Sequence, residues 1–168
     1  VMVYQRFFYE QFYKMGLQRT LPFAQYLQQA GHGLYYAELL PGGRVAYKLG
    51  FLLQKYPAKH FFAASCRQEL VRDWHIHIDN YCNFVPGYCA GLSLGDARDL
   101  DALCRGMNLD ELPVLRALLT RLEELYWLGK ELGYEEREGY VSKCHFCLDI
   151  RRHLIRSGEF KELQPQEF

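Results

Sequence analysis

The chain has 168 residues, a formal net charge of zero and a hydrophobic content of 49%. A chain of this length forms one domain or two small ones and can bury a core. The balanced charge argues against binding to nucleic acid or to a membrane surface, since both need a basic excess. No apolar run approaches the ~18 residues of a membrane span. We therefore expect neither nucleic acid nor a membrane among the partners.

The cysteines indicate a reducing compartment. The chain has six of them, and the segment Val1–Arg6 lacks the apolar core of an export signal. Metal binding or redox chemistry is then favoured over disulfides, although an even count leaves a disulfide framework open. We expect a cytoplasmic protein. The chain begins on Val and ends abruptly at Phe168, so we also expect a fragment of a longer protein.

The N-terminal third predicts helices and one strand. Aromatic residues at helical spacing predict a helix over 4–15, and Thr20 is a suitable cap for a second, short helix. A strand is expected over 34–40, closed by a Pro-Gly-Gly turn. An amphipathic helix is expected over 44–56, and Pro57 stops it.

A β-hairpin is expected next, with strands over 74–79 and 84–89 and a turn over 80–83. Because strand side chains alternate between faces, one face carries His75, His77 and Asp79. Two imidazoles and a carboxylate can bind a metal or line a substrate cavity. A polar strand face with one histidine bonded to a backbone carbonyl is an equal alternative. His75 and His77 are thus additional candidate metal ligands.

The C-terminal half predicts helices. One helix is expected from an Asp96 cap through Cys104, and the longest begins at an Asp110 cap. The longest helix has an apolar stripe made of Leu115, Leu118, Leu122, Leu125 and Leu132. A last helix is expected from a Ser142 cap through Arg156. The predicted class is α+β: a strand–helix N-terminal piece, a β-hairpin and a mostly helical C-terminal half.

Four cysteines are the leading candidates for a metal site. Cys144 and Cys147 lie three residues apart in the first turn of the last helix, where free N–H groups favour thiolates. The hairpin would bring Cys66 and Cys89 towards one end, so these are the natural partners. Four thiolates suit tetrahedral zinc or a four-iron cluster, and the spacing does not choose between them. Two simply buried thiols are the alternative for the CxxC pair.

Other residues near these motifs receive weaker assignments. Cys82 lies in the hairpin turn and is a further candidate ligand, although a turn role is favoured. Cys104 is expected to be a small buried hydrophobe. His145, inside the CxxC pair, is expected to be exposed. Three arginines of the last helix would neutralise a cluster or bind an anion, or would form a solvated face: Arg151, Arg152 and Arg156.

The cysteine pattern resembles a known family. The pattern runs from Cys66 through the turn at Cys82 and Asn83-Phe84-Val85-Pro86 to Cys89, then Ser93-Leu94-Gly95-Asp96 and the CxxC pair. It is similar to the SPASM or twitch region, the C-terminal auxiliary iron–sulfur element of many radical SAM enzymes. The turn glycine of that pattern is Cys82 here.

The resemblance implies an auxiliary [4Fe–4S] cluster ligated by Cys66, Cys89, Cys144 and Cys147. It implies that residues 1–60 are the end of a radical SAM partial barrel and that 61–168 form the auxiliary cluster domain. The CxxxCxxC motif that binds the S-adenosylmethionine-cleaving cluster does not occur in the sequence, so we expect it upstream of Val1. S-adenosylmethionine is then a cofactor of the full-length protein, and the barrel of the same chain is a partner. The chain alone is not expected to be catalytic, and its substrate is unknown.

Two rival hypotheses remain open. In the first, the same four cysteines, or His77 in place of one, hold zinc in a structural module that mediates protein–protein contact. In the second, the thiols are simply buried and the chain is a helical scaffold.

Overall fold

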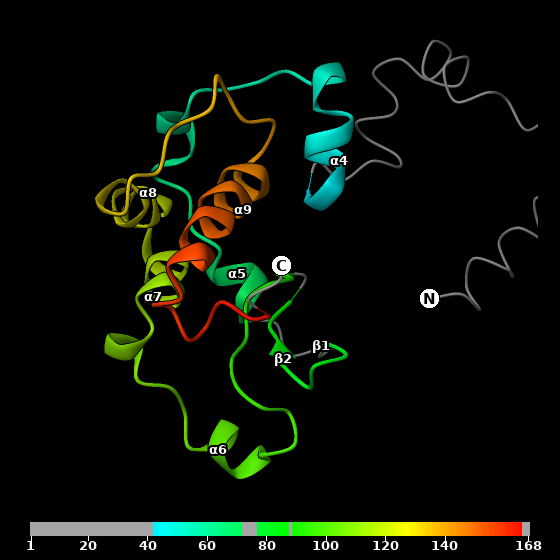
Figure 1. Ribbon diagram of the computed structural model, residues 1–168, viewed down its shortest axis with the longest axis vertical. Helices are drawn as coiled ribbons and strands as arrows, with labels where there is room; N and C mark the ends of the chain where they lie inside the picture. The colour runs from blue at the N-terminus through cyan, green and yellow to red at the C-terminus, as the bar shows by residue number, and fades with distance from the viewer. Residues whose placement is uncertain (1–41, 72–76, 88, 166–168) are drawn as a thin grey trace, which may run out of the picture. The chain divides into compact units, whose positions relative to one another are not determined.

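The computed structural model describes residues 42–71, 77–87 and 89–165 (Figure 1). The chain divides into two units at Leu39/Leu40, and all that follows concerns the second unit. The helices and the strand expected over 4–40 lie outside the described residues, as does His75. The domain boundary expected after residue 60 stays a prediction.

The described part combines helices with one small antiparallel sheet, which confirms the α+β class. The α-helices are α4 (Gly43–Lys48), α5 (Arg67–Leu70), α6 (Leu100–Cys104), α7 (Pro113–Thr120), α8 (Leu122–Glu131) and α9 (Lys143–Leu154). Short 3-10 turns are η1 (Gly50–Leu52), η2 (Ala58–Phe61), η3 (Leu109–Glu111) and η4 (Ile155–Ser157). The strands are β1 (His77–Ile78) and β2 (Phe84–Val85).

Helix α9 is the central element of the core. It contacts α4 on one side and α8 on the other, and α8 in turn contacts α7 (Figure 1). Its residues Phe146, Ile150 and Leu154, at a spacing of four, are fully buried in the core, where α9 contacts α8 and η2. Each such side chain stabilises the fold by about 1.5–3 kcal/mol relative to exposure. The core therefore fixes the rotation of α9 and the direction of its remaining faces.

The ends of α9 lie where the sequence predicts them. The Ser142 hydroxyl accepts a hydrogen bond from the N–H of His145 at 3.0 Å, which makes Ser142 the N-cap. After the last, 3-10 turn, Gly158 adopts the left-handed conformation with φ 70°. The prediction of a helix from Ser142 through Arg156 is confirmed.

The prediction of one long helix from Asp110 is wrong, because the structure has two shorter helices in its place. Backbone torsions at Arg121 are extended (φ −149°, ψ 139°), and this residue separates α7 from α8. The break occurs because the N–H of Leu122 donates to the carbonyl of Ala64 at 2.8 Å, a partner far away in the sequence. The predicted cap is also wrong, since Asn108 caps η3 and α7 begins only at Pro113.

Two further helices are shorter than predicted. The helix expected over 44–56 ends at Lys48, and Tyr56 instead pairs with Tyr140 through two backbone hydrogen bonds of 2.8 Å. A helical Tyr56 would not reach that partner. The helix expected from Asp96 begins only at Leu100, because the Asp96 carboxylate binds Arg98.

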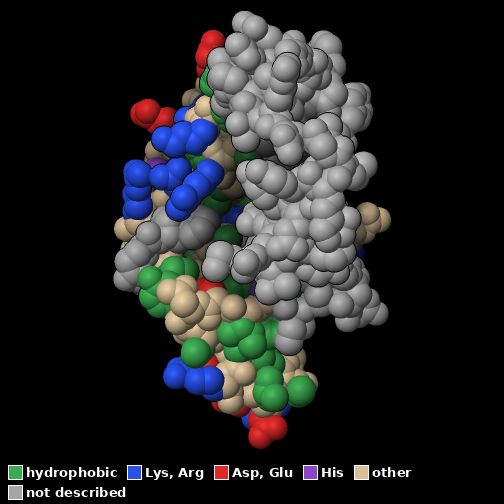
Figure 2. Space-filling model, turned by 90° about the vertical axis from the view of Figure 1, so that its right-hand side faces the viewer, with side chains coloured by type: hydrophobic (Ala, Val, Ile, Leu, Met, Phe, Trp, Pro, Cys, Tyr) green, Lys and Arg blue, Asp and Glu red, His purple; other side chains and the backbone are tan. Residues whose placement is uncertain are grey.

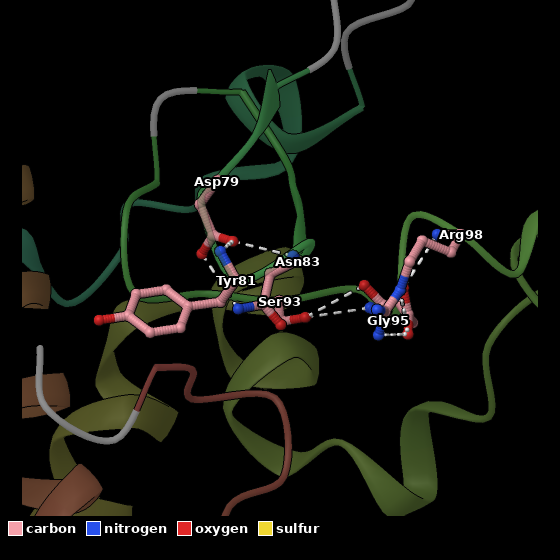
Figure 3. Close-up of polar contacts among 7 residues, drawn as sticks. Asp79, Tyr81, Asn83, Ser93, Gly95 and Arg98 are labelled. Carbon is pink, nitrogen blue, oxygen red and sulfur yellow. Dashed lines mark hydrogen bonds and ion pairs between the residues drawn. The ribbon is translucent and has the colours of Figure 1, made fainter.

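The predicted hairpin is present, with His77 opposite Val85. Its turn closes with a hydrogen bond from the N–H of Cys82 to the carbonyl of Asp79 at 3.1 Å, and Cys82 has φ 64°. The Asp79 carboxylate accepts bonds from the N–H of Tyr81 and from Asn83 (Figure 3). Glycine is the usual residue at this left-handed position, and Cys82 occupies it at a conformational cost.

Candidate metal centre

The four cysteines predicted as ligands lie within electrostatic range of one another, and we call them the cysteine group: Cys66, Cys89, Cys144 and Cys147. Cys66 is buried directly before α5, and its N–H is held by the carbonyl of Leu118 at 2.7 Å. Cys144 and Cys147 lie in the first turns of α9. The thiol of Cys66 hydrogen bonds to Cys147, and Cys89 is within electrostatic reach of the other three. Three segments distant in sequence thus contribute one set of sulfur atoms.

A glycine allows the hairpin segment to approach α5. Gly87 has φ 54°, and a Cβ atom at this position would overlap the carbonyl oxygen of Glu69. Any larger residue would push the two segments apart. Since Cys89 follows Gly87 and Cys66 precedes α5, this contact brings their two thiols together.

The thiols of the group ionise unequally. The hydrogen bond from Cys66 lowers the pKa of Cys147 to about 6, against the effect of burial, and Arg151 lowers it further. The same bond, together with burial, raises the pKa of Cys66. Of the two thiols, Cys147 therefore has the lower pKa and Cys66 the higher one. Burial raises the pKa of Cys89 to about 11.

Two cationic side chains adjoin the sulfur atoms. The guanidinium of Arg151, only 6% exposed, donates from Nη1 to the carbonyl of Ala90 at 3.0 Å and lies within electrostatic range of Cys147. The ammonium of Lys143 donates to the Glu69 carboxylate at 2.5 Å and lies near Cys66. Arg151 was among the residues singled out in the sequence; Lys143 was not, although it directly precedes the CxxC pair.

The remaining candidates fall outside this group. Cys82 lies in the hairpin turn near Arg98, and none of the described contacts of the cysteine group involves it. Cys104 is exposed, so the expectation of a buried residue is wrong. His145 is 5% exposed, so its predicted exposure is wrong as well. Its Nδ1 accepts a bond from the N–H of Val141 at 3.3 Å, because α9 turns this residue inward.

His77 and Asp79 line a cavity of about 880 Å³ between the hairpin, α4 and α9. Leu148, the neighbour of Cys147, lines the same cavity, which therefore comes close to the cysteine group. Arg152 also lines it, with its guanidinium 5.0 Å from the ring centre of Tyr47. Figure 2 views the molecule from the side of α4 and the hairpin, and Lys and Arg side chains gather on the upper left of the described surface. The Asp79 carboxylate is engaged in the turn, which leaves it less suited to a metal.

The sulfur set suits a soft metal or an iron–sulfur cluster. Within the described ranges, no three or more His, Cys, Asp or Glu side chains converge as a ready site for a single ion. One buried donor beside the sulfur atoms is left over: Nε of Arg151 has no hydrogen-bond acceptor among the residues that the structure describes. Four thiols, two cations and an unused buried donor fit an anionic, sulfur-ligated group.

Comparison with known proteins finds no relative of this chain. No family model, no curated protein and no solved structure matches the chain. In the part of the chain that the structure describes, no helix combines the length and the apolar character needed to cross a membrane.

Proposed function

We propose that this chain is the auxiliary iron–sulfur region of a radical SAM enzyme and that the cysteine group holds a [4Fe–4S] cluster. The observation that supports the proposal is that Cys66 and Cys89 lie within electrostatic range of the CxxC pair of α9. These four were selected from the sequence by their resemblance to the SPASM or twitch pattern. The unused Nε–H of Arg151 adds independent support, because a buried donor needs an acceptor.

The chain's own residues would bind the cluster and shield it. When bound, the cluster would supply a one-electron centre or an anchor for substrate. A cysteine ligates as a thiolate, so a thiol of the group must release its proton on ligation and binding is coupled to pH. The burial of these two thiols excludes water from their side of the site. S-adenosylmethionine, its cleaving motif and the unknown substrate belong to the upstream barrel of the full-length protein in this proposal.

Cysteine variants test the ligand assignment. After anaerobic reconstitution with iron and sulfide, Cys144→Ser and Cys66→Ser should lose the bound cluster and the stability that binding provides, since ligand binding to the folded state stabilises it. Cys104→Ser is the matched control, because this thiol is exposed and lies outside the group. The readouts are iron per chain and urea unfolding.

The outcomes separate the hypotheses. Loss of iron in the group variants but not in Cys104→Ser supports the assignment. Zinc in place of iron, lost in the same variants, would indicate the structural module instead. If Cys144→Ser and Cys104→Ser both behave like the wild type, the site assignment is wrong.

A further inference from the structure

Arg151 is the one residue near the cysteine group whose charge is both buried and unpaired within the described ranges. Its side chain is 6% exposed, and no Asp or Glu carboxylate in those ranges forms an ion pair with it. Removing a guanidinium from water is costly unless charge or hydrogen bonds compensate it. The groups that face it are the sulfur atoms of Cys147, Cys89 and Cys66.

The hydrogen bonds of Arg151 indicate where its charge acts. Nη1 donates to the carbonyl of Ala90, the residue after Cys89. One helical turn earlier on α9 lies Cys147, whose sulfur is within electrostatic range of the guanidinium. The side chain therefore links the loop of one ligand candidate to the helix of another. Its Nε–H remains without an acceptor in the described part.

Lys143 provides a contrast within the same site. Its ammonium lies 2.5 Å from the Glu69 carboxylate, so that the two charges largely cancel as seen from the sulfur atoms. Both side chains are also about one third exposed, at 31% and 33%, and water screens them. Among the described residues Arg151 has no carboxylate partner, and its burial shields it from solvent. It is thus the main uncompensated positive charge at the site.

We propose that Arg151 is a positioning residue that raises the reduction potential of the bound cluster. Reduction adds a negative charge to the cluster, and a buried cation beside the ligand sulfur atoms stabilises the reduced state more than the oxidised one. An N–H donated to a sulfur atom acts in the same direction. This inference rests on the proposed function, since it requires a cluster held by the cysteine group.

The test is a redox titration of the reconstituted 168-residue chain, with iron content measured first. Arg151→Gln removes the charge but keeps an amide that can donate to Ala90, and Arg151→Lys keeps the charge but loses Nε–H. Arg156→Met is the matched control, because this arginine lies on the same segment and is exposed. The reduced-to-oxidised ratio at a fixed potential should fall at least tenfold in Arg151→Gln, which is about 59 mV for one electron. Arg151→Lys should shift less, and Arg156→Met should match the wild type.

Each outcome decides the question. Arg151→Gln with wild-type iron content and wild-type potential would overturn the inference and leave the cluster assignment intact. If Arg151→Gln loses iron, Arg151→Lys decides: retention in the lysine variant supports the need for charge, and loss in both variants assigns Arg151 to packing and overturns the inference. A wild-type chain without iron would overturn the proposed function, and this inference with it.

Discussion

Two sides of helix α9 carry buried polar groups, and they differ in how completely these are satisfied. On one side, the Asp149 carboxylate accepts bonds from the hydroxyl of Tyr47 at 3.0 Å, from Nε of Arg137 at 2.6 Å and from the hydroxyl of Tyr134 at 2.8 Å. The Tyr134 hydroxyl also hydrogen bonds to that of Tyr140. On the other side, Arg151 and the cysteine group leave Nε without an acceptor in the described part.

The difference distinguishes a structural network from a candidate site. Asp149 and Arg151 are similarly buried, at 8% and 6% exposure, so burial alone does not separate them. The Asp149 carboxylate is satisfied by protein donors, which order the loop around Arg137 against the helix. On this side, Nε2 of His145, whose ring packs on Tyr47 and Tyr140, has no hydrogen-bond partner among the described residues. The Arg151 side ends in thiols and an unused donor, which an additional group would complete. Mutations should therefore affect stability on the first side and metal binding on the second.

The largest effect on stability is expected for Asp149→Ala. It leaves two tyrosine hydroxyls and a guanidinium without their shared acceptor, which should lower the free energy of unfolding by about 2–4 kcal/mol. Urea denaturation measures this change. Glu135→Ala, an exposed carboxylate nearby, should change stability by less than about 0.5 kcal/mol. Bound iron per folded chain should not change, and a loss of iron in Asp149→Ala would contradict the separation of the two sides.

Tyr134→Phe should have a smaller effect. The change removes one buried hydroxyl, and with it the bonds to Asp149 and Tyr140, at a cost of about 1–2 kcal/mol in the free energy of unfolding. Tyr126→Phe is the control, since its hydroxyl bonds to the Glu136 carboxylate at the exposed surface. Equal urea midpoints for the two variants would show that the Tyr134 hydroxyl is not part of a stabilising network.

Ser142→Ala should cost about 1 kcal/mol, because it removes the side-chain acceptor at the start of α9. The first turns of this helix carry Cys144 and Cys147, so fraying there should also weaken iron binding. Ser157→Ala, at the opposite end of the helical segment, should leave iron binding unchanged. A stable Ser142→Ala variant with weakened iron binding would still agree with this account, whereas wild-type stability and wild-type iron affinity together would contradict it.

The smallest effect is a pH dependence from Tyr47. Burial and the Asp149 carboxylate raise the pKa of Tyr47 to about 12, whereas an unfolded tyrosine titrates near ~10. The stability gained from neutral Tyr47 is therefore complete below pH ~10 and is lost as the pH rises towards ~12. The difference in unfolding free energy between the wild type and Tyr47→Phe should be constant from pH ~7 to ~9 and then shrink. A difference that grows above pH ~10 would refute the assignment.

The sequence predicts the elements that local interactions determine. The Ser142 cap and the hairpin turn depend on residues a few positions apart, and both were placed correctly. The break at Arg121 and the extended segment at Tyr56 depend on backbone partners far away in the sequence, Ala64 and Tyr140, which a local pattern does not contain. Propensity predicted continuous helices there, and tertiary hydrogen bonds overrode it.

In the candidate site, too, the sequence predicts what local patterns determine and misses what the assembled core determines. The CxxC spacing and the resemblance selected the four cysteines, whose thiols lie within electrostatic range of one another, and their role as ligands stays a prediction. Helical spacing of four links Cys147 to Arg151, but no sequence signal says that Arg151 is buried. The burial of His145 and the exposure of Cys104 also follow from the rotation of their helices in the assembled core. The types and spacing of the site residues were predictable from the sequence. Whether each side chain faces the core or the solvent was not.

The most direct measurement is the metal content of the anaerobically reconstituted wild-type chain, taken with its absorption spectrum. Our account predicts about four irons per chain and a broad band near ~400 nm, as expected for a cubane on cysteine ligands. Roughly one zinc and no colour would contradict the cluster and favour the structural module. A colourless chain without metal would leave the cysteine group as packing and refute the central claim.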